Sequence, residues 1–464
     1  LLIEADALDH AFIAEHTSGF DEFRDAVLAI DWADIERASG LTRADLERVS
    51  EQAKAAHSII VCWAMGLTQH KNSVPTIREI VNFLLLRGNI GRPGAGACPV
   101  RGHSNVQGDR TVGINERAPQ WFLDSLQQRF GIPVPREHGT DVVEAIRQMR
   151  DGRCGVFVAV GGNFVRATPD SALTESALRN VGLTVQVSTK LNGSHAFTGR
   201  RALILPTLGR TERDDTGGAR QFVTVEDSMG MVHASHGRLA PASDQLRSEV
   251  DIVCTIAERS VGDAGIDWAA MRSDYARIRA DIEATVPGFD DYERKVRDPS
   301  GFALPNGPRD SRTFVTRTGK ARFTVNPLEI VEVPPGHLLL QTVRSHDQFN
   351  TTIYGMDDVY RGITAGRRVV FIHPDDRAEL GFDEGAIIDL ISVWRGATGE
   401  VEERQAHAFR LVDYPTARGC VAAYFPETNV LVPLDSVADE SGTPTSKSIV
   451  VRLQPAIDAP VGVR

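Results

Sequence analysis

Short hydrophobic runs alternate with helical patterns along the first 330 residues of this 464-residue chain. Apolar residues spaced by threes and fours predict helices, as over 74–89. The same spacing fills residues 1–56, where Thr42 or Ser39 is the expected N-cap of a helix over 43–56. The intervening apolar runs are rich in β-branched residues and end in glycine or polar residues, which predicts strands within 57–66, 154–164, 183–190 and 201–207.

This alternation of strands and helices predicts an α/β fold, with Rossmann-like, mostly parallel sheets and covering helices. The pattern changes near residue 300, where 297–313 is rich in proline, glycine and charge and is interpreted as a linker or irregular loop. Strand patterns then dominate, with one short helix over 374–381, and they predict a separate barrel-like domain. The strands are expected within 337–345, 367–374, 385–394, 404–413, 419–426 and 447–453.

Composition narrows the range of partners and compartments. The net charge of −11 argues against a nucleic-acid or anionic membrane surface, and no apolar run approaches the roughly 20 residues of a membrane helix. The five cysteines stand far apart without a C-x-x-C motif, so neither a zinc ribbon nor an iron–sulfur cluster is expected within this chain. Scattered cysteines are typical of a reducing compartment, and the cytoplasm is the expected location.

A glycine-rich polar loop, "GNIGRPGAGACPVRGHSNVQGDR" at 88–110, follows the helix of 74–89. It contains no lysine or glutamate, and it combines guanidinium groups with amide and imidazole groups that can bind a phosphate or a heterocycle. A solvated surface loop is the alternative, and the pattern alone favours neither. The side chains that could bind a ligand are Arg101, His103, Ser104, Asn105, Gln107, Asp109 and Arg110.

The stretch from Trp63 to Arg110, "WAMGLTQHKNSVPTIREIVNFLLLRGNIGRPGAGACPVRGHSNVQGDR", resembles the molybdopterin-dependent oxidoreductases. It is most similar to formate dehydrogenase catalytic subunits and to their relatives of the YdeP type. The resemblance continues through "VAVGGNF", "STKLNGSH", "ALILPTLGRTE" and "FIHPDDRAELGFDEG" and spans essentially the whole chain. The chain starts at Leu1 inside a helical pattern, so we expect an N-terminally truncated fragment.

The resemblance implies a molybdenum or tungsten ion held by two molybdopterin guanine dinucleotides. It implies that 1–330 is a molybdopterin-binding α/β region of two interleaved subdomains. A double-psi β-barrel that closes over both pterins would occupy 331–464. A small-molecule substrate, with formate the nearest candidate, and an electron-transfer partner protein are implied as well. The family's metal ligand and its 4Fe–4S cluster would lie upstream of Leu1, so the fragment alone is not expected to turn over, and no residue here is assigned as a metal ligand.

Within the loop, Arg101 matches the family's active-site arginine, whose fixed charge can hold an anionic substrate. His103 stands where formate dehydrogenases have glutamine, and it would contact the cofactor or carry a proton. Ser104 is also a departure, since asparagine is usual there. The resemblance implies further cofactor contacts in the loop and in the turn after the first strand: Gly102, Ser104, Asn105, Gln107, Met65, Gly66 and Gln69.

Other implied cofactor contacts lie at later strand ends. Gly162 and Asn163 follow one strand, although a plain turn would explain them equally, and Thr189, Lys190 and Asn192 follow the next. Val187 replaces the family's guanine-binding aspartate, and Ser345 replaces a glutamate. "HPDD" at 373–376 is interpreted as a helix start with aspartate capping, not as a metal site. The contacts implied in the last domain are Arg344, His346, Tyr424, Asn429 and Lys447.

Two other functions compete with this interpretation. A non-catalytic nucleotide- or cofactor-binding scaffold could have kept the fold and lost the redox centre, and it would bind nucleotide without metal. An ordinary NAD-dependent α/β enzyme ranks last, because the strand-end loops lack G-x-G-x-x-G.

Overall fold

The N-terminal lobe combines helices with two small parallel pairs of strands in the computed structural model, which describes residues 1–262 and 264–456. A capping box begins the helix over 43–55, because the Thr42 hydroxyl and the Asp45 carboxylate each accept the other's backbone N–H. Thr42, and not Ser39, is therefore the N-cap. The lobe consists of α1 (His10–His16), β1 (Thr17–Ser18), α2 (Phe20–Leu28), α3 (Trp32–Ser39), α4 (Arg43–Ala55), β2 (Ile60–Trp63), α5 (Met65–Thr68), α6 (Ser73–Leu86) and β3 (Gly96–Pro99).

A later part of the chain completes this lobe. Residues 297–313, expected to be a linker, contain β9 (Phe302–Ala303), which pairs with β8 (Met231–Ser235) outside this lobe, and α16 (Gly307–Ser311). β10 (Ala321–Arg322) then pairs with β1 in parallel. Phe323 stacks on Phe23, with 5.1 Å between the ring centroids, inside a core that includes Phe12 and Leu85. The N-terminal lobe is therefore closed by residues more than 200 positions downstream.

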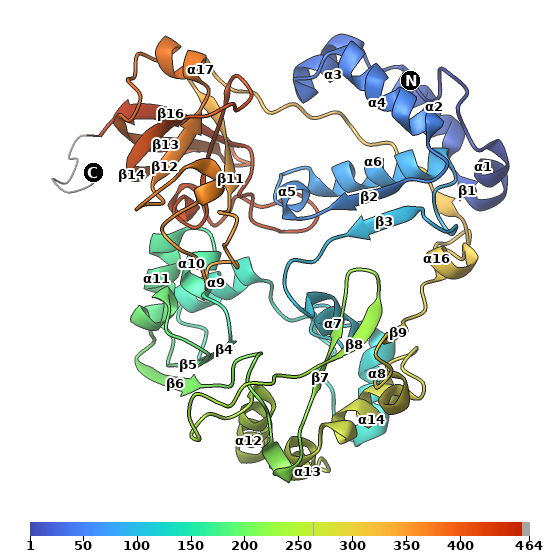
Figure 1. Ribbon diagram of the computed structural model, residues 1–464, viewed down its shortest axis with the longest axis vertical. Helices are drawn as coiled ribbons and strands as arrows, with labels where there is room; N and C mark the ends of the chain where they lie inside the picture. Colours follow the sequence, from blue (N-terminus) through green and yellow to red (C-terminus); the bar gives the residue numbers. More distant parts are fainter. Residues whose placement is uncertain (263, 457–464) are drawn as a thin grey trace.

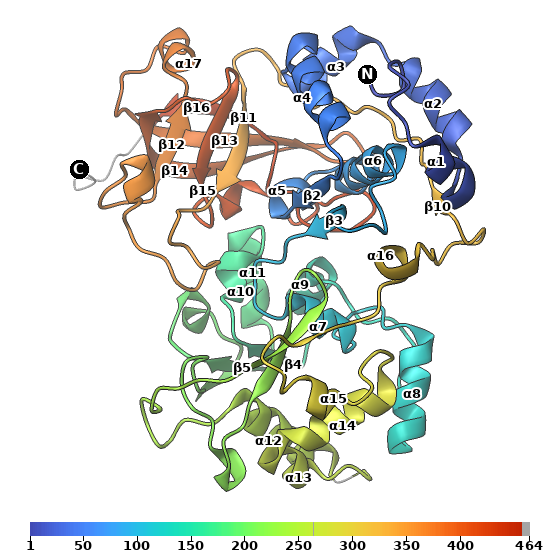
Figure 2. The ribbon, with the colours of Figure 1, turned by 45° about the vertical axis from the view of Figure 1, so that its right-hand side comes forward.

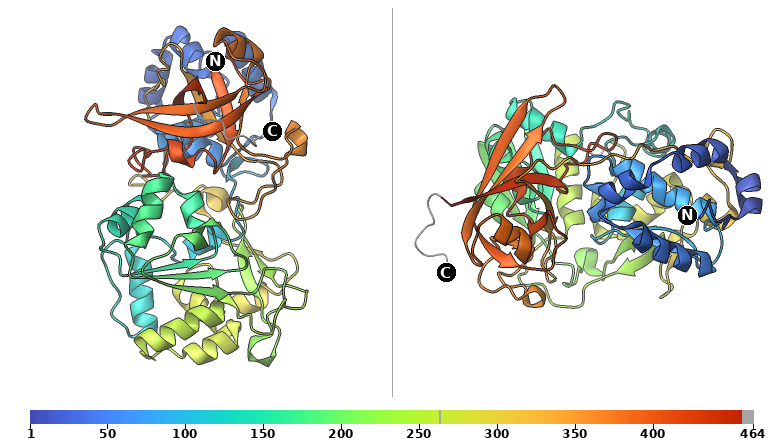
Figure 3. Two further views of the ribbon diagram at one scale, coloured as in Figure 1. Left: turned by 90° about the vertical axis from the view of Figure 1, so that its left-hand side faces the viewer. Right: turned by 90° about the horizontal axis from the view of Figure 1, so that it is seen from above.

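The lower lobe is built on a three-stranded parallel sheet in the order β4 (Val156–Val160), β5 (Leu183–Ser188) and β6 (Arg201–Pro206). Helices lie above and below these strands in Figure 3 (left). The apolar face of α9, with Val143, Ile146 and Met149, is buried in one core. The helices are α7 (Val106–Thr111), α8 (Gln120–Phe130), α9 (Val142–Arg150), α10 (Phe164–Ala167), α11 (Ser171–Arg179), α12 (Glu249–Val261), α13 (Trp268–Ser273), α14 (Tyr275–Thr285) and α15 (Tyr292–Lys295), with 3-10 turns η1 (Gly193–Ala196) and η2 (Thr216–Gly218).

An antiparallel hairpin, β7 (Val223–Glu226) and β8 (Met231–Ser235), rises from the lower lobe toward β3 (Figure 1). The sequence analysis assigned no elements to this region. The turn of the hairpin, residues 227–230, reaches the polar loop after β3 and is part of the site described below.

The third unit is a closed six-stranded barrel, in the order β11-β15-β12-β14-β13-β16 (Figure 2). β11 pairs with β15 and β12 with β14 in parallel, and the other neighbours are antiparallel. Alternate side chains such as Leu340, Val370 and Leu411 are fully buried inside it. The elements are β11 (Leu338–Val343), η3 (Val359–Arg361), β12 (Val369–Ile372), α17 (Pro374–Glu379), β13 (Ile387–Arg395), β14 (Val401–Asp413), β15 (Cys420–Tyr424), η4 (Asn429–Leu431) and β16 (Ile449–Pro455).

The predicted fold class, parallel sheets with covering helices followed by a C-terminal barrel, is confirmed. One detail of the barrel is corrected. α17 begins where "HPDD" predicted, but the cap is His373, whose Nδ1 accepts the backbone N–H of Asp375 at 3.2 Å. The Asp376 carboxylate instead accepts the N–H of Gly419 at 2.8 Å and pairs with Arg418. No aspartate caps this helix.

The barrel stands beside the N-terminal lobe, and both lie above the lower lobe in Figures 1 and 3. Arg78 of α6 forms a bidentate ion pair with Glu440, at 2.7 Å for each bond. Asp170 of the lower lobe forms another with Arg404 of β14, at 2.8 Å for each bond. The junction of the three units is where most of the predicted site residues meet.

Candidate functional site

The polar loop after β3 is fixed by the hairpin turn of β7 and β8. The backbone N–H of Arg101 donates to Ser228 Oγ at 2.8 Å, and Arg101 Nε donates to Gln107 Oε1 at 3.1 Å. Asn105 has a left-handed backbone (φ +66°), and its Oδ1 accepts the N–H of Glu226 at 3.0 Å. The Arg101 side chain is exposed, and its guanidinium is hydrogen-bonded to Gln107 through Nε.

His103 faces the barrel from the other side of this loop. Asn350 of the barrel donates its Nδ2 to Nε2 of His103 and accepts from Arg344 at 3.2 Å. Partial burial and the Arg344 charge lower the pKa of the His103 imidazole, which favours a neutral ring. Ser104 and Gly102 are exposed beside it, and a Cβ at Gly102 would meet nothing within 4 Å.

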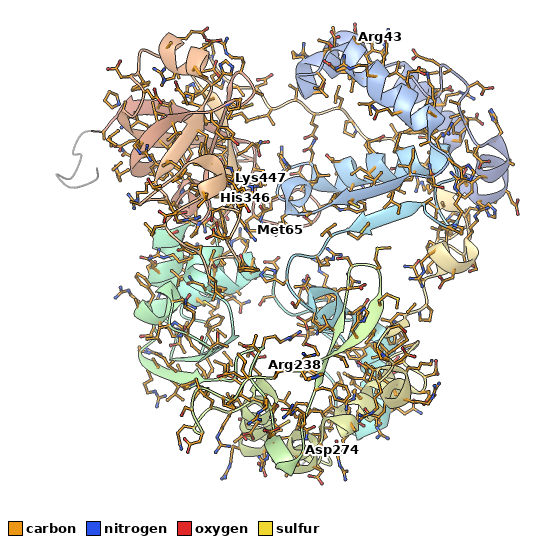
Figure 4. All side chains as sticks on the ribbon, in the orientation of Figure 1. Arg43, Met65, Arg238, Asp274, His346 and Lys447 are labelled. Atoms are coloured by element: carbon orange, nitrogen blue, oxygen red, sulfur yellow. The ribbon has the colours of Figure 1, made fainter. Side chains whose placement is uncertain are left out.

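The turn after β2 lies against the barrel strands, as Figure 4 shows for Met65, His346 and Lys447. The Arg344 guanidinium contacts the Met65 sulfur at 3.9 Å. The backbone N–H of Lys447 donates to the carbonyl of Gln69 at 3.2 Å, and Ser448 shares a hydrogen bond of 3.0 Å with His70. A Cβ at Gly66 would meet nothing within 4 Å, so the turn leaves room beside it. Met65, Gly66, Gln69, Arg344 and Lys447 are therefore brought together.

Among the residues that the structure describes, Arg344 and Lys447 are two partly buried cations without a carboxylate partner. Lys447 Nζ donates to the backbone carbonyl and to the hydroxyl of Thr342. Burial and the neighbouring Arg344 charge lower the pKa of Lys447 from 10.5 to about 8, and burial lowers the pKa of Arg344. Across residues 1–262 and 264–456, no salt bridge joins either cation to an acidic group. Such a pair is stabilised by a bound anion.

His346 and Tyr424 belong to a supporting network around Asp358. The buried Asp358 carboxylate accepts from Tyr424 at 2.7 Å, from Arg361 at 2.6 Å and lies 3.2 Å from His346 Nδ1. Burial opposes ionisation of Asp358, but these hydrogen bonds outweigh it and lower the pKa of the carboxyl. The Tyr424 side chain is fully buried in the barrel, so it can support His346 and Arg361 but presents no surface to a ligand.

The ends of β4 and β5 form a second group. Gly161 and Gly162 both have positive φ, and a Cβ on either would meet nothing within 4 Å. Asn192 Nδ2 donates to the Gly162 carbonyl at 2.7 Å. The side chains of Thr189 and Lys190 are exposed, and Thr189 lines a cavity of about 250 Å³. These strand ends therefore offer an open backbone turn beside a cavity.

Two of the predicted residues are buried, and their side-chain amides form hydrogen bonds within the protein. Asn163 is buried, donates to the carbonyl of Thr351 at 2.8 Å and accepts from the Ser194 hydroxyl at 2.9 Å. Asn429 is buried as well, and its amide donates to the carbonyl of Arg166. Both amides are used inside the protein, at the contact between the lower lobe and the barrel.

The sequence did not reveal Asn350 and its neighbour Thr351. These two residues connect the residues around His103 and Arg344 with those at the ends of β4 and β5. Asn350 bonds to His103 and Arg344, and the next residue accepts from Asn163. Asn350 has a positive φ of 53°, which asparagine tolerates better than most residues. The stretch around it has no strand or helix period, and only this asparagine in an irregular segment could have drawn attention to it.

The described residues hold no cluster of three or more His, Cys, Asp or Glu side chains arranged as metal ligands. Among these same residues, no helix is both long enough and apolar enough to cross a bilayer.

Comparison with known proteins identifies a matching domain and several relatives of this chain. Residues 338–450 match the model of the molydopterin dinucleotide binding domain. An uncharacterized oxidoreductase of Mycobacterium tuberculosis is 56% identical over 98% of this chain, and protein YdeP of Escherichia coli K12 is 43% identical over 97%. The chain spans 59% of the length of each of these two relatives.

Two more distant proteins are also similar to this chain. A Staphylococcus aureus protein, whose name suggests a formate dehydrogenase, is 28% identical over 84% of this chain and 40% of its own length. The structure of acetylene hydratase from Pelobacter acetylenicus has the same fold, with a TM-score of 0.68 at 13% identity, and the match covers 98% of this chain and 69% of that one. The chain is thus a homologue of the YdeP proteins with a molydopterin dinucleotide-binding domain, and it belongs to the molybdopterin oxidoreductase family.

Proposed function

We propose that this chain is the cofactor-binding part of the catalytic subunit of a molybdopterin-dependent oxidoreductase that performs two-electron redox chemistry. The observation that carries the proposal is the pair of partly buried cations, Arg344 and Lys447, without an acidic partner in the described chain. The cost of desolvating two neighbouring cations is offset when an anion binds between them. The pyrophosphate of a pterin dinucleotide is an anion that could bind in this way.

The surroundings of the two cations suit a dinucleotide. Gly66 leaves open space beside them, and the Arg344 guanidinium can form two parallel bonds to a phosphate. The turn at Gly161 and Gly162 is open in the same way and could take a nucleotide portion. When bound, bis(molybdopterin guanine dinucleotide) would supply the molybdenum or tungsten ion that exchanges electrons with the substrate.

We assign the substrate side of the site to Arg101 and His103. The Arg101 guanidinium is exposed and has donors left after its bond to Gln107, so it can hold a small anionic substrate. His103 is kept neutral by partial burial and by Arg344, so its Nε2 can accept a proton that the substrate releases once the hydrogen bond from Asn350 is broken. A small carboxylate such as formate is the substrate class that this pair favours.

The test is to purify the protein from a host that makes the cofactor, and to measure molybdenum, tungsten and the guanine nucleotide released by acid. The expected result is one metal ion and two guanine nucleotides per chain. Arg344→Ala and Lys447→Met should each lower the bound nucleotide at least about 10-fold, as expected when a charged partner of a phosphate is lost. Arg43→Ala is the matched control, since Arg43 lies on α4 away from the junction (Figure 4).

Each other outcome has a distinct meaning. Nucleotide without metal would support a cofactor-binding scaffold and refute the redox function. Neither metal nor nucleotide, from folded protein, would refute the cofactor site. Equal loading of wild type, Arg344→Ala and Lys447→Met would show that the two cations do not hold the dinucleotide.

A further inference from the structure

Three sulfur atoms gather directly behind the site, where β2 meets β3 and the hairpin turn. Cys62 and Cys98 are direct partners in the parallel pairing of the two strands, so their side chains point to the same face. The Cys98 thiol donates to the Met229 sulfur at 3.6 Å, and the thiol of Cys62 lies beside it. Cys62 is exposed, and Met229 is 52% exposed, so the cluster is accessible.

The electrostatic surroundings of this cluster favour a cation. The nearby Asp227 carboxylate would attract a positive ion, which displaces the thiol protons as it binds. Asp227 is held in place, because its carboxylate accepts the backbone N–H groups of Met229 and Met231 at 2.8 and 3.1 Å.

The distance between the Cys98 and Met229 sulfurs suits shared coordination of a metal ion. Metal–sulfur bonds of about 2.3 Å place two sulfurs of a trigonal site about 4 Å apart, close to the 3.6 Å between Cys98 and Met229. A donor set of two thiolates and a thioether selects a soft ion such as Cu(I).

We propose that Cys62, Cys98 and Met229 form a binding site for a soft, thiophilic metal ion of the Cu(I) type. One Cu(I) ion binds as two thiols become thiolates, two protons leave to solvent and no electron is transferred. The site uses only this chain's own side chains and does not depend on the proposed function.

A bound ion would connect the elements that position the residues of the candidate site. Cys62 lies three residues before Met65, and Cys98 lies three residues before Arg101. An ion bound to both cysteines would tie together the strands that lead into the two turns, and through Met229 it would also fix the hairpin turn that holds the Arg101 backbone.

The test is a Cu(I) titration of the full, reduced protein under anaerobic conditions, against a chromogenic Cu(I) chelator, at several pH values. We expect one Cu(I) per chain, bound more tightly as the pH rises because protons are released. Cys62→Ser and Cys98→Ser should each weaken binding at least about 100-fold, and Met229→Leu about 10-fold. Cys154→Ser and Cys420→Ser are the matched controls and should bind as the wild type does.

Far-UV circular dichroism of each variant verifies that it is folded, so that lost binding reports on the ligands. Wild-type affinity in folded Cys62→Ser or Cys98→Ser would overturn the proposal. So would the absence of Cu(I) binding to protein whose thiols are fully reduced. Loss of both thiols on treatment with hydrogen peroxide, without any Cu(I) uptake, would mean that the pair forms a disulfide and is not a metal site.

Discussion

Replacing Lys447 by methionine tests the electrostatics of the junction in the cofactor-free protein. Burial and the Arg344 charge lower the pKa of Lys447 from 10.5 to about 8. A difference of this size corresponds to about 3 kcal/mol of free energy of unfolding. The two hydrogen bonds that Nζ donates to Thr342 return about 1 kcal/mol each. At pH 7 the Lys447→Met protein should therefore be more stable than the wild type by about 1 kcal/mol.

The pH dependence identifies the cause. Below about pH 8 both the folded and the unfolded wild type carry the Lys447 proton, and the folded state bears the full cost of the buried charge. Between about pH 8 and 10.5 only the unfolded state keeps this proton, so the wild type gains stability as the pH rises. The advantage of Lys447→Met should therefore vanish and then reverse, with a total change of about 3 kcal/mol.

Urea unfolding of both proteins at pH 7, 8.5 and 10 measures this difference. Lys71→Met is the matched control, because Lys71 is exposed close by and its variant should follow the wild type at each pH. A Lys447→Met protein that is less stable than the wild type by about 2 kcal/mol at pH 7 would refute the reasoning, since the hydrogen bonds would then outweigh the desolvation cost. So would a difference that stays constant with pH.

Three further predictions concern neighbouring residues. Asp358→Asn should lower the free energy of unfolding by about 3 kcal/mol in urea titrations, because it breaks a buried charge network; an unchanged midpoint would contradict this. Gly108→Ala should lower the guanine nucleotide bound by protein from a cofactor-producing host, because its Cβ would strike the Asn105 side chain, whereas Gly155→Ala has open space and should load normally. The pKa of His103 is lowered from 6.5 in the folded state, so the unfolded state binds a proton first as the pH falls. The free energy of unfolding should therefore decrease as the pH drops below 6.5. Thermal melts of His103→Asn should show a smaller decrease.

The barrel strands could be predicted from sequence because their signal is local. Alternation along 337–345 or 404–413 identifies a strand wherever its partners lie, and all six predicted strands are present. The same holds for α4, whose capping box spans only Thr42 to Asp45. The hairpin of β7 and β8 was missed although it alternates too. Its strands have four and five residues, and its turn, Asp227–Gly230, was the available signal.

The composition of the site could be predicted only in part. Resemblance selected Arg344 and Lys447. That both lack an acidic partner within the described part of the chain depends on contacts across more than 100 residues. Tyr424 and Asn163 were predicted as cofactor contacts, and the structure uses their polar atoms internally. Asn350 was missed for the opposite reason, since nothing in its local pattern shows that it bonds to His103, which lies 247 residues away.

The site residues lie across the contact between two units that have separate cores, so cofactor binding should change local stability unevenly. Lys447 bonds to Gln69, and Ser448 bonds to His70, at the edge of the barrel. If the dinucleotide pyrophosphate binds Arg344 and Lys447, it removes the desolvation cost at this contact and leaves the barrel interior unchanged. Amide hydrogen exchange around residue 447 should then slow more on loading than exchange at Leu340 and Leu411. Uniform protection would instead mean that the cofactor stabilises the barrel as a whole, and no change at 447 would place the pyrophosphate elsewhere.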